Sequence, residues 1–196
     1  MNLRNSGSAR FFVALLPPQA LQDEITAIKQ DIWQRFGSKA ALKSPPHITL
    51  QPPFQWPLAE ANKLEHHLEA FARTQPAVPI RLAGYSAFVP PRVIYIDVVQ
   101  TAQLMAVQPA IAAYLEETCG IVDRVGKTRL FTPHVTVGFR DLTPAAFRLA
   151  WAEFQHRPFA ADFVAQTLTL LRHDGQIWQT FSQLPLLARP QQEANS

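Results

Sequence analysis

The chain has 196 residues, and 47% of them are hydrophobic, which is enough to bury a core in one domain or in two small lobes. The 18 Lys and Arg residues exceed the 15 Asp and Glu residues by only three, so the net charge does not indicate a polyanion partner, and an anion site has to be local. The single cysteine excludes an internal disulfide and a cysteine-based zinc site, and it fits a reducing, cytoplasmic location. The chain has neither an apolar run of about 18 residues nor the apolar core of a signal peptide, so we expect no membrane contact and no export.

The first half of the chain predicts a strand, a helix, a second strand and a second helix. Residues 10–16 form an apolar run that two prolines end, as in a buried strand. Apolar residues at helical spacing follow over residues 21–32, and Gly37 is placed to end that helix. Residues 47–50 alternate as a strand, and residues 58–73 again have the helical period.

The second half predicts a similar series of elements. Residues 78–89 and 92–99 are rich in β-branched and aromatic residues and meet at two prolines, so they should pair as strands. A helical period follows, with Pro109 inside it, where we expect a kink or a new start. The remaining predictions are a strand at 134–137, a helix at 144–155 capped by Thr143, and strands at 159–172 and 176–185 joined by Asp174-Gly175, which supply the positive φ angles of a hairpin turn.

The two halves share a pattern around a repeated motif. Pro46-His-Ile-Thr-Leu50 and Pro133-His-Val-Thr-Val137 each follow a loop, begin a strand and precede a helix. This likeness predicts an internal duplication. We therefore expect an α+β fold with a pseudo-twofold axis, as one bilobal domain over residues 9–187 between polar tails at 1–8 and 188–196.

Each motif strand offers one imidazole beside one hydroxyl. Side chains two apart on a strand share a face, so His47 lies beside Thr49 and His134 beside Thr136, while the aliphatic residues between them point into the core. Brought together, the four groups suit a phosphate diester, because one histidine can deprotonate the attacking group while the other protonates the leaving oxygen. The threonines can donate hydrogen bonds to the non-bridging oxygens, so this mechanism needs no metal and no cofactor.

At these motifs the sequence resembles the two-histidine (2H) phosphoesterases, and within them the 2′-5′ RNA ligases or RNA 2′,3′-cyclic phosphodiesterases. The resemblance spans most of the chain and rests on residues 11–17, 46–50, 87–97 and 131–137. It implies two lobes of antiparallel sheet with outer helices around a central cleft. It also implies hydrolysis of a 2′,3′-cyclic phosphate to a 2′-phosphate, without a cofactor.

One departure from the family concerns the cation near the phosphate. Many sequences of the RNA group carry an arginine two residues after the second motif, whereas here Phe139 has that place and Arg140 comes one place later. A shift by one residue on a strand turns a side chain to the opposite face. Loop cations before the motifs are the alternatives, namely Lys43, Lys127 and Arg129, and of these we assign only Arg129 to phosphate binding.

The substrate is expected to be an RNA 3′ end or a small cyclic nucleotide. A nucleobase would stack on an aromatic face, for which the candidates are Phe54, Trp56, Phe88 and Phe139, and of these we assign Phe54 and Phe139. We expect a monomer that binds no metal. Three questions stay open from the sequence: whether the chain is instead a non-catalytic binder of nucleotides or RNA ends, whether it runs the reverse reaction as a ligase, and which histidine is the base.

Overall fold

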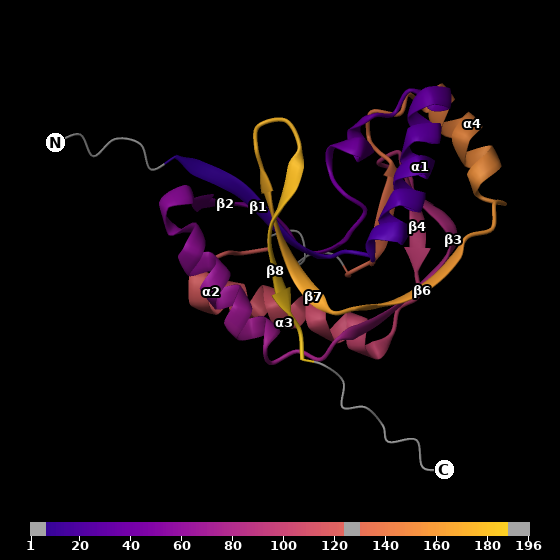
Figure 1. Cartoon of the computed structure of the whole chain (residues 1–196). Helices are drawn as coiled ribbons and strands as arrows, with labels where there is room; N and C mark the ends of the chain where they lie inside the picture. Colours follow the sequence, from indigo (N-terminus) through magenta and orange to yellow (C-terminus); the bar gives the residue numbers. More distant parts are fainter. Residues whose placement is uncertain (1–6, 124–129, 188–196) are drawn as a thin grey trace, which may run out of the picture.

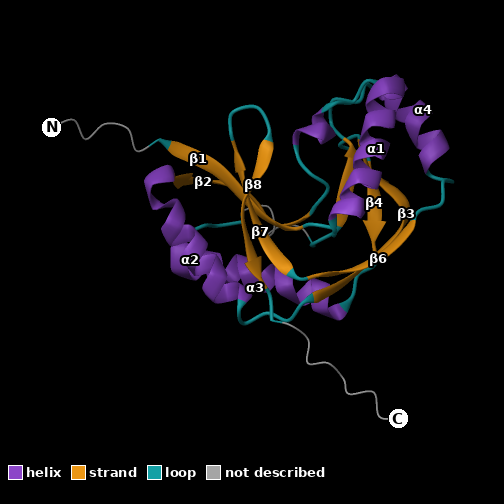
Figure 2. Ribbon diagram, in the orientation of Figure 1, coloured by secondary structure: helices purple, strands orange, loops and turns teal. Residues whose placement is uncertain are grey.

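The computed structural model describes residues 7–123 and 130–187, and it shows an α+β fold with two four-stranded antiparallel sheets and helices packed outside them (Figures 1 and 2). The first sheet has the order β2-β1-β7-β8 and the second has the order β5-β4-β3-β6. The strands of the first sheet are β1 (Ser8–Leu15), β2 (Ile48–Pro57), β7 (Thr167–His173) and β8 (Trp178–Pro185). Those of the second are β3 (Val78–Phe88), β4 (Val93–Val98), β5 (His134–Gly138) and β6 (Ala160–Ala165). The helices are α1 (Gln19–Phe36), α2 (Ala61–Ala72), α3 (Ala102–Cys119) and α4 (Pro144–Phe154), with short 3-10 turns η1 (Ala40–Lys43) and η2 (Leu58–Glu60).

The two sheets repeat the same connectivity around the motif strands. In each sheet the motif strand lies at the edge. In the first sheet this is β2, which follows His47, and in the second it is β5, which begins with His134. Each motif strand pairs antiparallel with the strand that precedes it by one helix, β1 in the first sheet and β4 in the second. The predicted fold class, with two pseudo-symmetric lobes, is therefore confirmed.

The connecting helices cross between the sheets. α1 leaves β1 of the first sheet but packs against β5 and α4 of the second, while α3 leaves β4 of the second sheet and packs against β2 of the first (Figure 1). Gln108 of α3 donates a hydrogen bond of 3.3 Å from Nε2 to the backbone oxygen of Leu50 on β2. α1 packs so closely on β5 that a Cβ at Gly138 would lie 3.5 Å from Cγ2 of Ile32. Each motif strand is thus supported by a helix from the other half of the chain.

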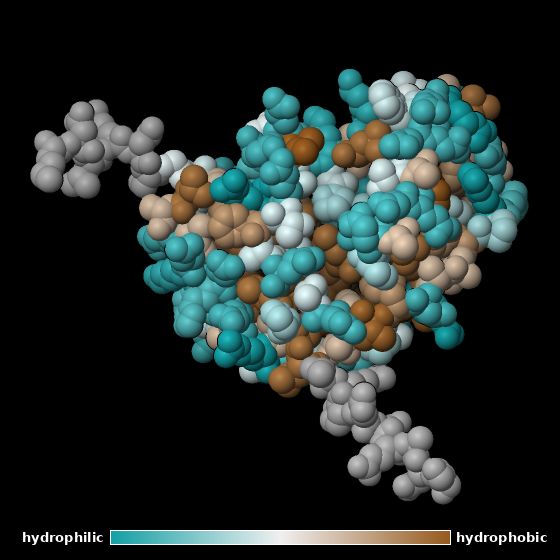
Figure 3. Space-filling view, viewed as in Figure 1, coloured by the Kyte–Doolittle hydropathy of each residue, from teal (hydrophilic) through white to brown (hydrophobic). Residues whose placement is uncertain are grey.

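The apolar residues divide into a large core and a small separate cluster. The large core lies between the sheets and the helices, and in the first sheet it takes Phe11, Val13 and Leu15 of β1. The alternate residues of β1 point to the opposite face, where Phe12 and Ala14 join Leu171 in the small cluster. On the outer surface, hydrophilic side chains cover most of the face shown in Figure 3, and apolar residues show between them across its middle.

Several local predictions are confirmed. Gly37 ends α1 with a φ of 78°, in the left-handed region that favours glycine. Thr143 caps α4 by accepting a hydrogen bond of 3.1 Å at Oγ1 from the amide of Ala146, and Pro144 is the first residue of that helix. In the described residues no helix is both long and apolar enough to cross a bilayer.

Other local predictions are wrong in instructive ways. The single strand expected at 159–172 is two strands, because the chain leaves the second sheet after β6 and enters the first sheet at β7. β2 continues to Pro57 through two prolines, which an edge strand tolerates since one side of it needs no ladder hydrogen bonds. Of the two alternatives for Pro109, a new start is wrong, because α3 is one helix from Ala102 to Cys119. In the β7–β8 turn only Gly175 has a positive φ, while the Asp174 carboxylate accepts hydrogen bonds from the two amides that follow Gly175.

Candidate active site

The fold brings the two motifs to one region. The edge strands β2 and β5 contact each other across the two sheets, although 87 residues separate their histidines in the sequence. The side chain of His134 contributes electrostatically to the lowered pKa of His47, so the two imidazoles lie within interaction range. Thr49 and Thr136 are partly exposed, while the aliphatic residues on either side of each threonine are fully buried. Alternation along the strands thus keeps each hydroxyl on the face of its histidine.

Both imidazoles are held by the same hydrogen bond. Nδ1 of His47 lies 2.7 Å from the backbone oxygen of Pro45, and Nδ1 of His134 lies 2.7 Å from that of Thr132. A carbonyl oxygen can only accept, so each Nδ1 carries the hydrogen and donates it. In the neutral ring the lone pair is then on Nε2, so this atom can accept a proton.

The charges around the two histidines differ. The pKa of His47 is lowered to about 4, mainly by burial and also by the Lys29 and His134 charges, against the hydrogen bond to Pro45, which raises it. Burial also lowers the pKa of His134, but the Asp97 carboxylate on the neighbouring strand raises this pKa. Both rings are therefore neutral at pH 7, and the electrostatic setting favours a proton on His134 over one on His47.

Aromatic rings lead away from His47 along the first sheet. Phe12 lies with its ring centroid 4.7 Å from that of His47, and Trp178 lies 4.6 Å from Phe12. His173 contacts Trp178 at 4.9 Å, and the guanidinium of Arg10 lies over the Trp178 ring at 5.3 Å. We refer to Arg10, Phe12, His173 and Trp178 as the Trp178 platform. It combines a cation with aromatic faces, as single-stranded nucleic-acid sites do.

Aromatic rings also surround His134. Tyr95 lies 5.2 Å and Phe88 lies 5.0 Å from the imidazole, and the two rings are 4.5 Å from each other. Each histidine thus has an aromatic neighbour on the adjacent strand of its own sheet, Phe12 on β1 and Tyr95 on β4. These neighbours fix the orientation of the rings and exclude water from one side of each imidazole.

The structure does not bring the aromatic residues assigned from the sequence to the histidines. Phe54 packs into the large core and stacks on Phe11 at 6.3 Å, on the face of β1 opposite to Phe12. Phe139 lies beyond the end of β5, where its amide donates a hydrogen bond of 3.0 Å to Oγ of Ser38. The rings at the histidines are Phe12, Tyr95 and Phe88, and of these only Phe88 was among the aromatic candidates from the sequence.

The cations assigned from the sequence give a similar result. Arg140 is exposed with its guanidinium 5.4 Å from the centroid of the Phe139 ring, and both residues follow the end of β5, so strand alternation does not apply to them. Lys43 is exposed on η1. Arg129 and Lys127 lie outside the described residues, so the assignment of Arg129 to phosphate binding stays a prediction.

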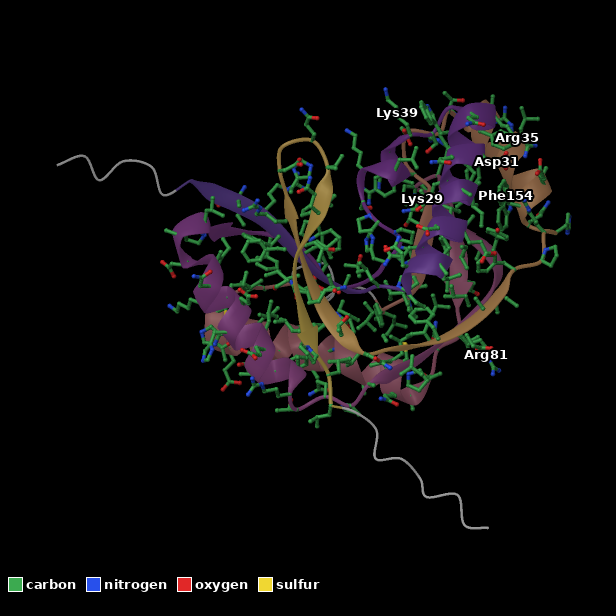
Figure 4. The ribbon with its side chains drawn as sticks, in the orientation of Figure 1. Lys29, Asp31, Arg35, Lys39, Arg81 and Phe154 are labelled. Atoms are coloured by element: carbon green, nitrogen blue, oxygen red, sulfur yellow. The ribbon has the colours of Figure 1, made fainter. Side chains whose placement is uncertain are left out.

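A lysine that the sequence analysis missed acts electrostatically on His47. Lys29 on α1 is only 1% exposed, and its Nζ donates a hydrogen bond of 3.0 Å to the backbone oxygen of Ser44 (Figure 4). Burial lowers the pKa of Lys29 to about 7. Lys29 comes four residues after Ile25 and three before Ile32, so it lies in the buried stripe of α1. This spacing is the feature of the sequence that could have predicted its burial.

The segment that leads to His47 is also tied to the loop after the second motif. The Asp141 carboxylate accepts hydrogen bonds from Oγ of Ser38 at 2.6 Å and from the amides of Lys39 and Ala40 at 2.9 Å each. These bonds join the start of η1 to the chain that follows β5. The two histidine-bearing segments are therefore held against each other, and this contact accounts for the position of Phe139.

Within residues 7–123 and 130–187, no three His, Cys, Asp or Glu side chains are grouped as metal ligands. The expectation that the reaction needs neither a metal nor a cofactor stays a prediction. The groups that the structure does gather at the motifs are imidazoles, hydroxyls, one buried amine and aromatic rings.

Comparison with known proteins agrees with this geometry. A family model described as the 2′-5′ RNA ligase superfamily matches residues 17–177. The chain belongs to the 2′-5′ RNA ligase superfamily. Its membership confirms the resemblance to the 2H phosphoesterases that the two His-x-Thr motifs indicate.

Related superfamily members come from several bacteria. A protein of Geobacillus kaustophilus with a provisional phosphoesterase name is 28% identical over 148 residues, which are 74% of this chain and 78% of that protein. A similarly named protein of Bacillus pumilus is 30% identical over 129 residues, 65% of this chain and 68% of its own. Among solved structures, a protein of Thermus thermophilus matches with a TM-score of 0.68 at 18% identity over 92% of this chain and 100% of its own. Escherichia coli LigT, solved with 3′-AMP, has a TM-score of 0.68 at 17% identity over 92% of this chain and 99% of its own. These two likenesses show the shared fold.

Proposed function

We propose that this superfamily member is a phosphodiesterase that opens the 2′,3′-cyclic phosphate at an RNA 3′ end or on a nucleotide to give a 2′-phosphate. The observation that carries the proposal is the matched pair of histidines on touching edge strands, each with Nδ1 bonded to a backbone carbonyl and Nε2 left for proton transfer. Two such groups are what in-line displacement at phosphorus requires, one on each side of the phosphate.

The charge asymmetry assigns the two roles. His47 is the more strongly held in its neutral form, so it acts as the base and takes a proton from the attacking water at Nε2. His134, whose protonated form the Asp97 charge favours, acts as the acid in that form, with hydrogens on both ring nitrogens. The water oxygen bonds to phosphorus, the bond from phosphorus to the 3′-oxygen breaks, and that oxygen takes the proton from Nε2 of His134. The product is a 2′-phosphate with a free 3′-hydroxyl, and exchange with solvent returns both histidines to their starting forms.

Thr49 and Thr136 are assigned to the non-bridging oxygens. Each hydroxyl lies two residues from its histidine on the same strand face and is partly exposed. Hydrogen bonds aimed at oxygens that gain charge in the transition state are worth more than those made equally in the ground state.

A nucleotide substrate is supported by the aromatic surroundings and by the fold. The Trp178 platform continues from His47 and offers a ring face with a guanidinium above it. Such faces stack on unpaired bases with little sequence preference. Escherichia coli LigT, which shares the fold, has been solved with 3′-AMP, a nucleotide with a phosphate at the same ribose edge.

The test is incubation with an oligoribonucleotide ending in a 2′,3′-cyclic phosphate, and with free 2′,3′-cyclic AMP, in the presence of EDTA. We expect 2′-phosphate products from the wild-type protein and none from His47→Ala or His134→Ala. His66→Ala, at an exposed position on α2, is the matched control and should keep full activity. Turnover that EDTA abolishes, or 3′-phosphate products, would count against the mechanism.

The same experiment separates the alternatives. A non-catalytic binder would retain the substrate unchanged and would show no pH-dependent rate. A ligase would join the cyclic phosphate to an added RNA with a 5′-hydroxyl, which is the reverse of the same displacement. We favour hydrolysis because a binder has no use for two histidines in matched tautomers.

A further inference from the structure

Lys29 is a buried cation with no carboxylate beside it. Its side chain is 1% exposed, and among the described residues it takes part in no ion pair. An ammonium has three donors, and the hydrogen bond to the Ser44 carbonyl uses one of them. A buried, unpaired ammonium is costly for a fold, so one that is bonded to the segment leading to His47 calls for a role.

The hydrogen bond from Lys29 anchors the chain segment that bonds to the imidazole of His47. Ser44, whose oxygen accepts from Nζ, directly precedes Pro45, and the oxygen of Pro45 accepts from Nδ1 of His47. The residue between them and the histidine is Pro46, so two prolines restrict the backbone between the lysine anchor and the imidazole. A continuous path therefore runs from α1 to the ring through the hydrogen bond to Ser44, the adjacent Pro45 and the hydrogen bond between Pro45 and His47.

The charge of Lys29 also reaches the site. It acts electrostatically on His47, together with His134, while Asp97 acts on His134 from the second sheet. Lys29 is thus a buried cation on the His47 side of the site, whereas Lys43 and Arg140 are exposed. Because the pKa of Lys29 is lowered to about 7, the amine exchanges its proton near neutrality, and a bound anion would favour the charged form.

We propose that Lys29 is the positioning residue of His47 and the buried cation that stabilises an anion bound beside that histidine. The role of the cation rests on the proposed function, since the anion in question is the substrate phosphate. From the sequence, this phosphate-binding charge was expected from a loop cation, Arg129.

The experiment compares the wild-type protein with Lys29→Met, Lys29→Gln and the control Lys39→Met, which removes an exposed lysine between α1 and η1 (Figure 4). Methionine matches the shape of lysine but has neither donor nor charge, whereas glutamine keeps a donor for Ser44. The pKa of His47 is measured by NMR of the imidazole, and the affinity for inorganic phosphate is measured by titration. The third readout is kcat/KM on cyclic AMP as a function of pH.

For Lys29→Met we expect the pKa of His47 to rise toward its ordinary value, phosphate affinity to fall about 10-fold or more, and kcat/KM to fall about 10- to 100-fold, as for a lost hydrogen bond to a charged group. Lys29→Gln should recover part of kcat but not the phosphate affinity, and Lys39→Met should match the wild type. Unchanged His47 pKa and unchanged phosphate affinity in Lys29→Met would overturn the proposal, and if that variant does not fold, the same readouts on Lys29→Gln decide. The NMR and phosphate readouts need no turnover, so they judge Lys29 even if cyclic phosphates prove not to be the substrate.

Discussion

Replacing Lys29 by methionine should change how the stability of the protein depends on pH. The pKa of Lys29 falls from 10.5 in the unfolded chain to about 7 in the folded protein. Between these values the unfolded chain binds a proton that the folded protein does not, so the free energy of unfolding rises as pH rises through this window. Each unit of pKa difference corresponds to about 1.4 kcal/mol, which gives roughly 2 kcal/mol of added stability between pH 7 and pH 9.

The measurement is urea unfolding of the wild-type protein and Lys29→Met at pH 7, 8 and 9. The difference between the two proteins cancels the groups they share, so Lys29→Met should be the more stable at pH 7, and its advantage should shrink by roughly 2 kcal/mol by pH 9. Lys39→Met, which removes an exposed amine, should follow the wild type at every pH. A difference between wild type and Lys29→Met that stays constant from pH 7 to pH 9 would show that Lys29 keeps its charge throughout, and it would refute the reasoning from burial.

Three further changes probe the site. Asp97→Asn removes the charge that raises the pKa of His134, so the alkaline limb of kcat/KM should move to lower pH, whereas an unmoved limb would reverse the assigned roles. In the wild-type protein the lowered pKa of both histidines places the maximum of kcat/KM below pH 6.5, which a rate profile in chelator checks directly. Trp178→Ala should raise KM for an RNA end about 10-fold with little change in kcat, since base stacking is worth about 1–3 kcal/mol. Equal KM values for the variant and the wild type would show that the base does not stack on the Trp178 platform. Thr136→Val should lower kcat about 100-fold at an unchanged melting temperature, and a loss of stability instead would indicate a structural hydroxyl.

The sequence predicts the elements of this fold better than it predicts their assignment to sheets. The strand at β1, the helix α1 with its Gly37 end and the Thr143 cap all follow from local spacing and local chemistry. The division of residues 159–172 between two sheets does not, because both parts are extended and apolar and only their partners differ. The length of β2 was missed for a related reason, since whether prolines are tolerated depends on the strand lying at an edge.

For the site, the motif histidines and threonines could be found because the repeat marks them. Phe12 and Trp178 could not, since they lie 166 residues apart in the chain and meet only through the pairing of β1 with β7 and of β7 with β8. Phe54 was assigned on its distance from the motif along the chain, whereas irregular register between β1 and β2 turns it to the core. Lys29 has the spacing of a buried position, but a lysine in an apolar stripe is normally assigned to the surface.

Because α1 and α3 cross between the sheets, each half of the chain depends on the other for the packing of its motif strand. Each half of the chain supplies the helix that packs on the motif strand of the other half, so neither half completes its own part of the candidate site. Local melting in one sheet would release the histidine of the other as well. The protein should therefore lose its chemistry and its structure in one concerted step, with no half-competent species between the working enzyme and the unfolded chain.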